Sequence, residues 1–209
     1  MKAPKLALGR RSPVTKLLAT AAVLAAAASI AGLGTFATFT STTSVSHTIS
    51  SGTVTIALGA TGASTNRLNV NATAIAPGDT IQRSVDLINQ GTLDLASVTL
   101  TTSATSSSLL DTDTTNGLQM VIDKCPVAWT ESGPPYTYTC GGSTSSVLAS
   151  RPVIGSNLAL SNLGSLSAGT TDHLRVTLTF PSGAPNTLQN QSSTISYAFT
   201  GTQRTATDK

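Results

Sequence analysis

The stretch LRVTLTF, residues 174–180, decides the fold class because every second residue in it is apolar. Leu174, Val176, Leu178 and Phe180 alternate with polar residues, and successive side chains of a β-strand point to opposite faces of a sheet. One face of this strand is therefore predicted to be buried and the other to face water. Strands of this kind belong to antiparallel sheets that are covered on one side only.

The same alternation recurs along the rest of the chain. It places apolar side chains on one face in four further segments: TVTIAL (53–58), TIQRSVDL (80–87), LQMVI (118–122) and TISYAF (194–199). Helix signals are nearly absent, because Thr, Ser, Val and Gly dominate while Glu, Lys and Gln are scarce. Two antiparallel sheets packed face to face bury strands of this kind. The sequence therefore predicts an all-β antiparallel β-sandwich over residues 53–202, followed by a short disordered tail at 203–209.

The first residues of the chain have the order of a secretory signal. Five Lys and Arg residues without an acid occupy the first 16 positions, an Ala-rich apolar run follows, and Thr35-Phe36-Ala37 matches a small-x-small cleavage pattern. We predict a signal peptide over residues 1–37, cut by a signal peptidase between Ala37 and Thr38. An uncleaved membrane anchor is the alternative, because the apolar run is about long enough to span a bilayer.

Removal of this leader changes the net charge of the protein. The whole chain has 12 Lys and Arg against 9 Asp and Glu, whereas the mature chain has seven basic residues against nine acidic ones. The remaining basic residues are scattered singly along the sequence, but a nucleic-acid-binding protein needs clustered cations to neutralise phosphates. We therefore expect no nucleic-acid partner, and no membrane association after processing.

Cys125 and Cys140 are the only cysteines, and in an exported chain such a pair is expected to form a disulfide. The residues between them, PVAWTESGPPYTYT, are typical of a β-hairpin that turns at residues 132–135. Closing a loop of about 15 residues contributes roughly 3 kcal/mol to stability in the chain-entropy model.

Candidate metal ligands are few. The chain has two histidines, His47 and His173, and no H-E-x-x-H motif, whereas a catalytic zinc site uses about three protein ligands and a general base. His173 is predicted to face solvent, on the side of the strand opposite Leu174. A site built on both histidines requires carboxylates such as Asp172 or Glu131 to converge on them. We expect no catalytic residues and no cofactor.

One oxygen-rich segment is a candidate calcium site. The segment DTDTTNG, residues 111–117, resembles a calcium-binding loop of the D-x-D-x-N-G kind, with Asp111, Asp113 and Asn116 as its ligands. It has one residue too many and no Glu at the closing position. The alternative is a polar connector that leads into the next predicted strand.

Four further stretches follow one another along the chain: GTFATF (34–39), SGTVTI (51–56), APGDT (76–80) and NQGTLDL (89–95). Taken in this order, they resemble the TasA/camelysin family of exported bacterial surface proteins. The resemblance covers the leader and most of the first half of the mature chain. It implies a jelly-roll-like β-sandwich, cleavage by a SipW-type signal peptidase, and secretion to the cell surface or the extracellular matrix of a biofilm. TasA-like members assemble into matrix fibres, whereas camelysin gives the family its metallo-endopeptidase label.

The resemblance also implies a role for an N-terminal arm, residues 38–52. In TasA-like fibres the corresponding segment leaves its own subunit and completes the sheet of the next one. Residues 38–51 are uncharged and β-prone, which suits β-strand addition, with Phe39, Val45 and Ile49 as anchors. A disordered arm, or an edge strand within the same subunit, is the alternative.

These observations together predict a non-catalytic secreted structural protein, a subunit or accessory of an extracellular fibre. Its expected partners are further copies, joined head to tail, or related matrix subunits. The alternatives are a surface metallo-endopeptidase and a monomeric adhesion or binding module.

Overall fold

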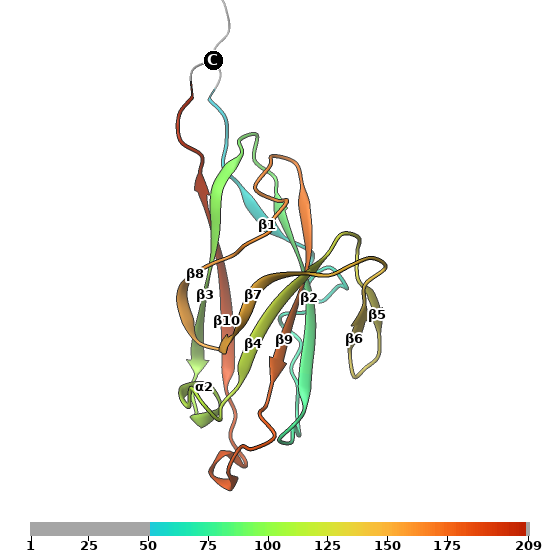
Figure 1. Ribbon diagram of the computed structural model, residues 1–209, viewed down its shortest axis with the longest axis vertical. Coiled ribbons are helices and arrows are strands. Elements are labelled where there is room, and N and C mark those ends of the chain that lie inside the picture. The colour runs from blue at the N-terminus through green and yellow to red at the C-terminus, as the bar shows by residue number, and fades with distance from the viewer. Residues whose placement is uncertain (1–50, 208–209) are drawn as a thin grey trace, which may run out of the picture. The chain divides into compact units, whose positions relative to one another are not determined.

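Two antiparallel β-sheets pack face to face in the computed structural model, which describes residues 51–207 (Figure 1). The large sheet has the strand order β1-β2-β9-β4-β7, and the small sheet has the order β10-β3-β8. The strands of the large sheet are β1 (Ile56–Leu58), β2 (Thr80–Asn89), β9 (Thr171–Thr179), β4 (Gln119–Cys125) and β7 (Ser145–Pro152). Those of the small sheet are β10 (Thr194–Gln203), β3 (Leu95–Ser106) and β8 (Gly155–Ala159). Every strand pair is antiparallel, which confirms the predicted all-β class.

The centre of the large sheet is β9, the strand from which the sequence argument starts. Leu174 and Val176 are completely or almost completely buried, and they lie opposite Val85 of β2 and Ile122 of β4 respectively. The inner face of the small sheet meets them with residues of β3 such as Leu100. Burying an aliphatic side chain of this size stabilises the fold by about 1.5–3 kcal/mol. The alternating pattern thus positions one core between the two sheets.

The remaining elements are short. A third sheet consists of the hairpin of β5 (Thr130–Ser132) and β6 (Thr137–Thr139). A single helical turn, α2 (Leu109–Thr112), follows β3, and a 3-10 turn, η1 (Asn186–Leu188), precedes β10. Ser108 caps α2, because its hydroxyl accepts the N–H of Leu110 while the carboxylate of Asp111 accepts the N–H of Ser108.

The last strand of the sandwich, β10, ends near residue 203. Strand β10 includes Gln203, and the N–H of Arg204 still donates to the carbonyl of Asp94, at 3.2 Å. The strand continues because its partner β3 is twelve residues long. The finer prediction of a jelly roll stays a prediction.

Several predictions fall outside the described residues. The signal peptide, the cleavage site between Ala37 and Thr38, and the anchors Phe39, Val45 and Ile49 all belong to this part of the chain. Across residues 51–207, no helix combines the length and the hydrophobicity that a bilayer crossing requires.

Candidate functional site at the sheet edges

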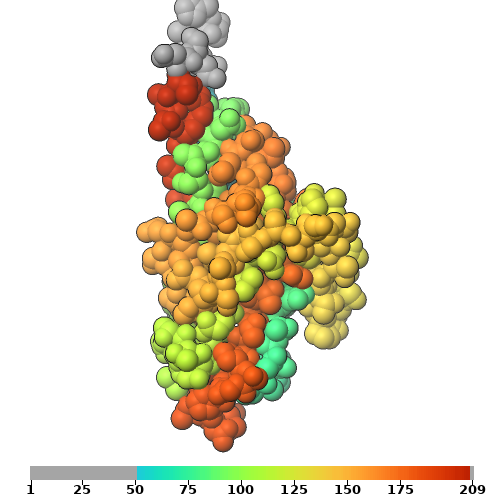
Figure 2. Space-filling view, viewed as in Figure 1, coloured from blue at the N-terminus to red at the C-terminus, as the bar shows by residue number. Residues whose placement is uncertain are grey.

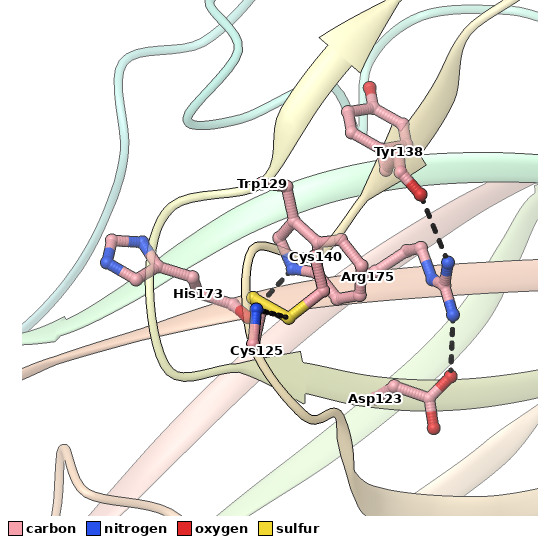
Figure 3. The surroundings of a disulfide bond; sticks show 8 residues. Asp123, Cys125, Trp129, Tyr138, Cys140, His173 and Arg175 are labelled. Carbon is pink, nitrogen blue, oxygen red and sulfur yellow. Dashed lines mark hydrogen bonds and ion pairs between the residues drawn. A yellow bond between two sulfur atoms is a disulfide. The ribbon is translucent and has the colours of Figure 1, made fainter.

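The disulfide attaches the hairpin to the large sheet. Cys125 is the last residue of β4, Cys140 directly follows β6, and their Cα atoms are 5.6 Å apart. Both the predicted disulfide and the predicted hairpin are confirmed. The indole N–H of Trp129 donates to the carbonyl oxygen of His173 at 2.9 Å, which holds the hairpin on the outer face of the large sheet (Figure 3). The hairpin forms a lobe at the side of the sandwich (Figure 2).

Polar side chains of β9 lie beneath this lobe. The guanidinium of Arg175 is 4.4 Å from the centre of the Trp129 ring and donates to Asp123 at 3.2 Å (Figure 3). Nδ1 of His173 lies 2.8 Å from the carboxylate of Asp86, and the His173 side chain is only 24% exposed. The prediction that His173 faces open solvent is therefore wrong, because β2 and the hairpin both contribute partners to this face.

The carboxylates considered for a zinc site lie with other partners. Asp172 is buried and accepts hydrogen bonds from Lys124 and from the N–H groups of Gly164 and Ser165. Its burial opposes ionisation, but these hydrogen bonds outweigh that effect and keep its pKa below the ordinary value. In the part of the chain that the structure describes, no three His, Cys, Asp or Glu side chains gather in a metal-binding arrangement. His47 lies outside this part.

The candidate calcium ligands are engaged in local hydrogen bonds. The carboxylate of Asp111 accepts from Ser107 and Ser193 as well as from the α2 cap, and these bonds outweigh burial to hold its pKa below the ordinary value. Asp113 accepts from the backbone N–H and the side-chain amide of Asn116, which lower its pKa in the same way. The structure thus assigns both carboxylates to the turn itself, and calcium binding stays a prediction.

The edges of the two sheets are the remaining candidate site. An edge strand presents unpaired N–H and C=O groups that can bind another strand, and monomeric proteins shield such edges with charges, prolines, bulges, short strands or covering loops. The edge strands here are β1 and β7 in the large sheet, and β8 and β10 in the small sheet.

Three of these edges carry such shielding. β7 contains Arg151 and Pro152, and its pairing with β4 is interrupted by two register shifts. β8 is only five residues long and includes Asn157, whose φ of 51° lies in the left-handed region. β1 is three residues long, so most of β2 extends beyond it.

A loop covers the part of β2 that β1 leaves open. The N–H of Arg67 donates to the carbonyl of Ser84 at 2.9 Å, and the N–H of Asp86 donates to the carbonyl of Thr65 at 2.7 Å. Arg83 of β2 adds a charge on the same edge: its guanidinium donates to the carbonyl oxygens of residues 70, 71 and 82. Burial lowers the pKa of Arg83. The edge of β2 is therefore occupied by a loop and an arginine.

The hairpin supports this cover. Glu131 of β5 accepts two hydrogen bonds from the Arg67 guanidinium, at 2.6 and 2.9 Å, and a third from the hydroxyl of Tyr138. The Arg67 bonds, more than any other contact, keep the pKa of Glu131 below its ordinary value. The guanidinium groups of Arg67 and Arg83 lie 4.7 and 5.6 Å from the centre of the Tyr136 ring. A groove of about 760 Å³ remains between the hairpin turn, the loop and the start of β2.

The edge of β10 differs from the other three. β10 pairs with β3 over ten residues, and within residues 51–207 no strand pairs with its opposite side, which we call the outer edge of β10. Its sequence, TISYAFTGTQ, has no charged residue and no proline. Ile195, Tyr197 and Phe199 are half-buried and contact the core, and burial raises the pKa of Tyr197 to about 12.

Comparison with known proteins identifies the family. The model of the camelysin metallo-endopeptidase family matches residues 14–124, more than half of the chain. The chain belongs to the camelysin family. This confirms the resemblance found in the sequence. No curated protein matches the chain significantly. Camelysin-family proteins are surface or secreted proteins.

The camelysin match ends within β4, so the hairpin, β9 and β10 lie beyond it. The edge residues were also missed by the sequence argument, which predicted a strand at 194–199 without its place at the rim of a sheet. The signal available in the sequence was the absence of charge from residue 194 to residue 203.

Proposed function

We propose that this camelysin-family protein is a non-catalytic structural subunit, or accessory, of an extracellular or biofilm-matrix fibre. In this proposal a signal peptidase removes residues 1–37, and the mature chain is secreted. Residues 38–51 of one subunit then pair with a sheet of the next subunit. Because a strand donated head to tail repeats without closing, the product is a filament rather than a ring.

The observation that carries this proposal is the unequal size of the two sheets. Five strands face three, and the small sheet ends at a strand whose apolar side chains, Ile195, Tyr197 and Phe199, are only partly buried against the core. A strand added there shields apolar surface as well as satisfying backbone groups, and each 100 Å² of apolar surface removed from water contributes about 2.5 kcal/mol. The proposed donor segment, residues 38–51, is uncharged and β-prone, with Phe39, Val45 and Ile49 as apolar anchors.

Deletion of residues 38–51 from the mature chain tests the proposal. We expect the full mature chain to form filaments in a concentration-dependent manner, seen by electron microscopy and by sizing, and the deleted chain to stay a folded monomer. Deletion of residues 205–209, of which 205–207 are exposed in the described part of the chain, is the matched control and should leave filaments intact. Normal polymerisation of the chain that lacks residues 38–51 would rule out strand donation.

A surface metallo-endopeptidase is the second candidate, favoured by the description of the matched family. Zinc-dependent cleavage of casein by the purified protein, abolished by a chelator, would support this activity. A stable monomer that neither cleaves casein nor forms filaments would instead leave an adhesion or binding module.

A further inference from the structure

We propose that β10 is the acceptor strand, and that residues 38–51 of a second copy pair along its outer edge as a fourth strand of the small sheet. This inference rests on the proposed function and adds the site at which donation takes place. The matched family segment ends at residue 124, so the acceptor lies in a part of the chain that the family comparison does not cover.

Elimination of the other edges is the first argument. At β7, pairing with an added strand is opposed by Arg151, by Pro152 and by the register shifts of the strand. At β8, only five residues are available, and Asn157 among them has a left-handed backbone conformation. At β2, an added strand must displace a loop held by backbone hydrogen bonds and by the Arg67–Glu131 ion pair. β10 is the one edge strand of residues 51–207 that is long and uncharged and has no strand paired with its outer edge.

The side chains of β10 are the second argument. Its outward-facing residues, Ser196, Ala198 and Thr200, are exposed, whereas Ile195 and Phe199 alternate with them on the inner face and are half-buried. β1 approaches this rim only at one end, where Ile56 packs over Gly201. A strand beside β10 therefore places every second side chain over the half-covered part of the core, which is the pattern of pockets that β-strand addition uses.

The donor segment fits this edge in length and charge. Residues 38–51 are fourteen residues, and at about 3.3 Å per residue they extend roughly 46 Å, whereas ten residues of β10 extend roughly 33 Å. The segment can therefore pair along the whole of β10 and still leave a few residues as a linker. Neither strand carries a Lys, Arg, Asp or Glu, so no like-charge pair opposes their association.

The start of the described chain, which follows the donor segment in sequence, also supports this choice of donor. Thr53 pairs with Thr92 and Leu93 through backbone and hydroxyl hydrogen bonds, next to the point where Leu95 pairs with Gln203. The described chain therefore begins beside the C-terminal end of β10 (Figure 1). Residue 51, to which the donor segment is covalently joined, thus lies near one end of the proposed acceptor edge, which suits a head-to-tail chain of subunits.

Cross-linking between two populations of the mature chain, each with one introduced cysteine, tests the assignment. One population carries Val45→Cys and the other carries Ala198→Cys on β10; the two native cysteines are already paired, so the introduced thiols are the reactive ones. Filaments grown from an equal mixture are treated with a short bismaleimide, which tolerates a slip of register. Ala149→Cys is the matched control, because Ala149 is also exposed and lies on the edge strand β7.

We expect the Val45→Cys population to cross-link to Ala198→Cys at least tenfold more than to Ala149→Cys, and Thr200→Cys, a second exposed site on β10, to repeat the result. Filaments that cross-link equally or preferentially at position 149 would overturn β10 as the acceptor and leave the fibre function standing. Absence of filaments would overturn the proposed function and this inference with it. A single chain with both Val45→Cys and Ala198→Cys that cross-links within a monomer would show that the segment pairs with its own β10.

Discussion

Loss of the disulfide has a cost that can be worked out from the loop it closes. Cys125 and Cys140 are 15 residues apart, and in the chain-entropy model a loop of that size contributes about 3 kcal/mol. The double variant Cys125→Ala/Cys140→Ala therefore lowers the free energy of unfolding by about 3 kcal/mol, if the hairpin unfolds together with the sheets. The hydrogen bond from Trp129 to the carbonyl of His173 couples the two parts and predicts that it does.

Urea denaturation followed by two signals measures this effect. The chain has one tryptophan, so Trp129 fluorescence reports on the hairpin, while far-ultraviolet circular dichroism reports on the sheets. With a slope of about 1–3 kcal/mol per molar urea, a loss of about 3 kcal/mol lowers the midpoint by about 1–3 M. We expect both signals to shift together.

The matched control is Thr137→Ala/Thr139→Ala, which changes two exposed residues of the same hairpin and keeps the disulfide. Its midpoint should shift much less, because exposed substitutions usually change stability by about 0.5 kcal/mol or less. An unchanged midpoint in the cysteine double variant, or a fluorescence transition that separates from the circular dichroism transition, would refute the view that the hairpin is part of one cooperative unit.

Three further changes have defined outcomes. Thr102→Val removes the buried hydroxyl that donates to the carbonyl of Val153 and accepts from the N–H of Gly155. It should lower the free energy of unfolding, measured by urea denaturation, by about 2–4 kcal/mol. Thr102→Ser keeps the hydroxyl, and its free energy of unfolding should stay close to that of the parent. Asp111 has a lowered pKa when folded, so its stabilising effect is present above about pH 4 and is lost as the pH falls through the folded pKa; Asp111→Asn should flatten this acid limb of the stability curve. Glu131→Gln breaks the partly exposed ion pair with Arg67 and should lower the free energy of unfolding by about 1 kcal/mol or less. It should also raise the rate of amide hydrogen exchange in the loop at 59–67.

The fold class was predictable because alternation is a local property. β9, β2, β4 and β10 each contain a stretch in which every second residue is buried or half-buried, and all four were read from sequence. β3 was missed because a register irregularity separates its first buried residue, Leu95, from Val98 by three positions. β8 was missed because five residues with one buried side chain carry too little pattern.

The candidate site was less predictable because it depends on strand order. The hairpin followed from two cysteines close in sequence, which is local information. The solvent exposure of His173 was predicted wrongly, because its neighbours Asp86 and Trp129 come from segments 87 and 44 residues away. Whether β10 is central or at an edge likewise depends on which strands pair, and composition alone does not contain that information.

The uneven shielding of the four edges also bears on the kind of assembly that the proposed function requires. A linear filament needs one acceptor edge per subunit, because a second open edge lets two donors bind one body and produces branching or lateral aggregation. Arg83 is consistent with this requirement: it lies in the part of β2 that β1 leaves unpaired, is partly desolvated, and donates to three carbonyl groups there. Replacing it with a neutral residue of similar length, Arg83→Met, removes the charge that guards β2. We expect this variant to form branched or bundled filaments in electron micrographs, whereas filaments as straight and single as those of the parent would show that the arginine does not guard the edge.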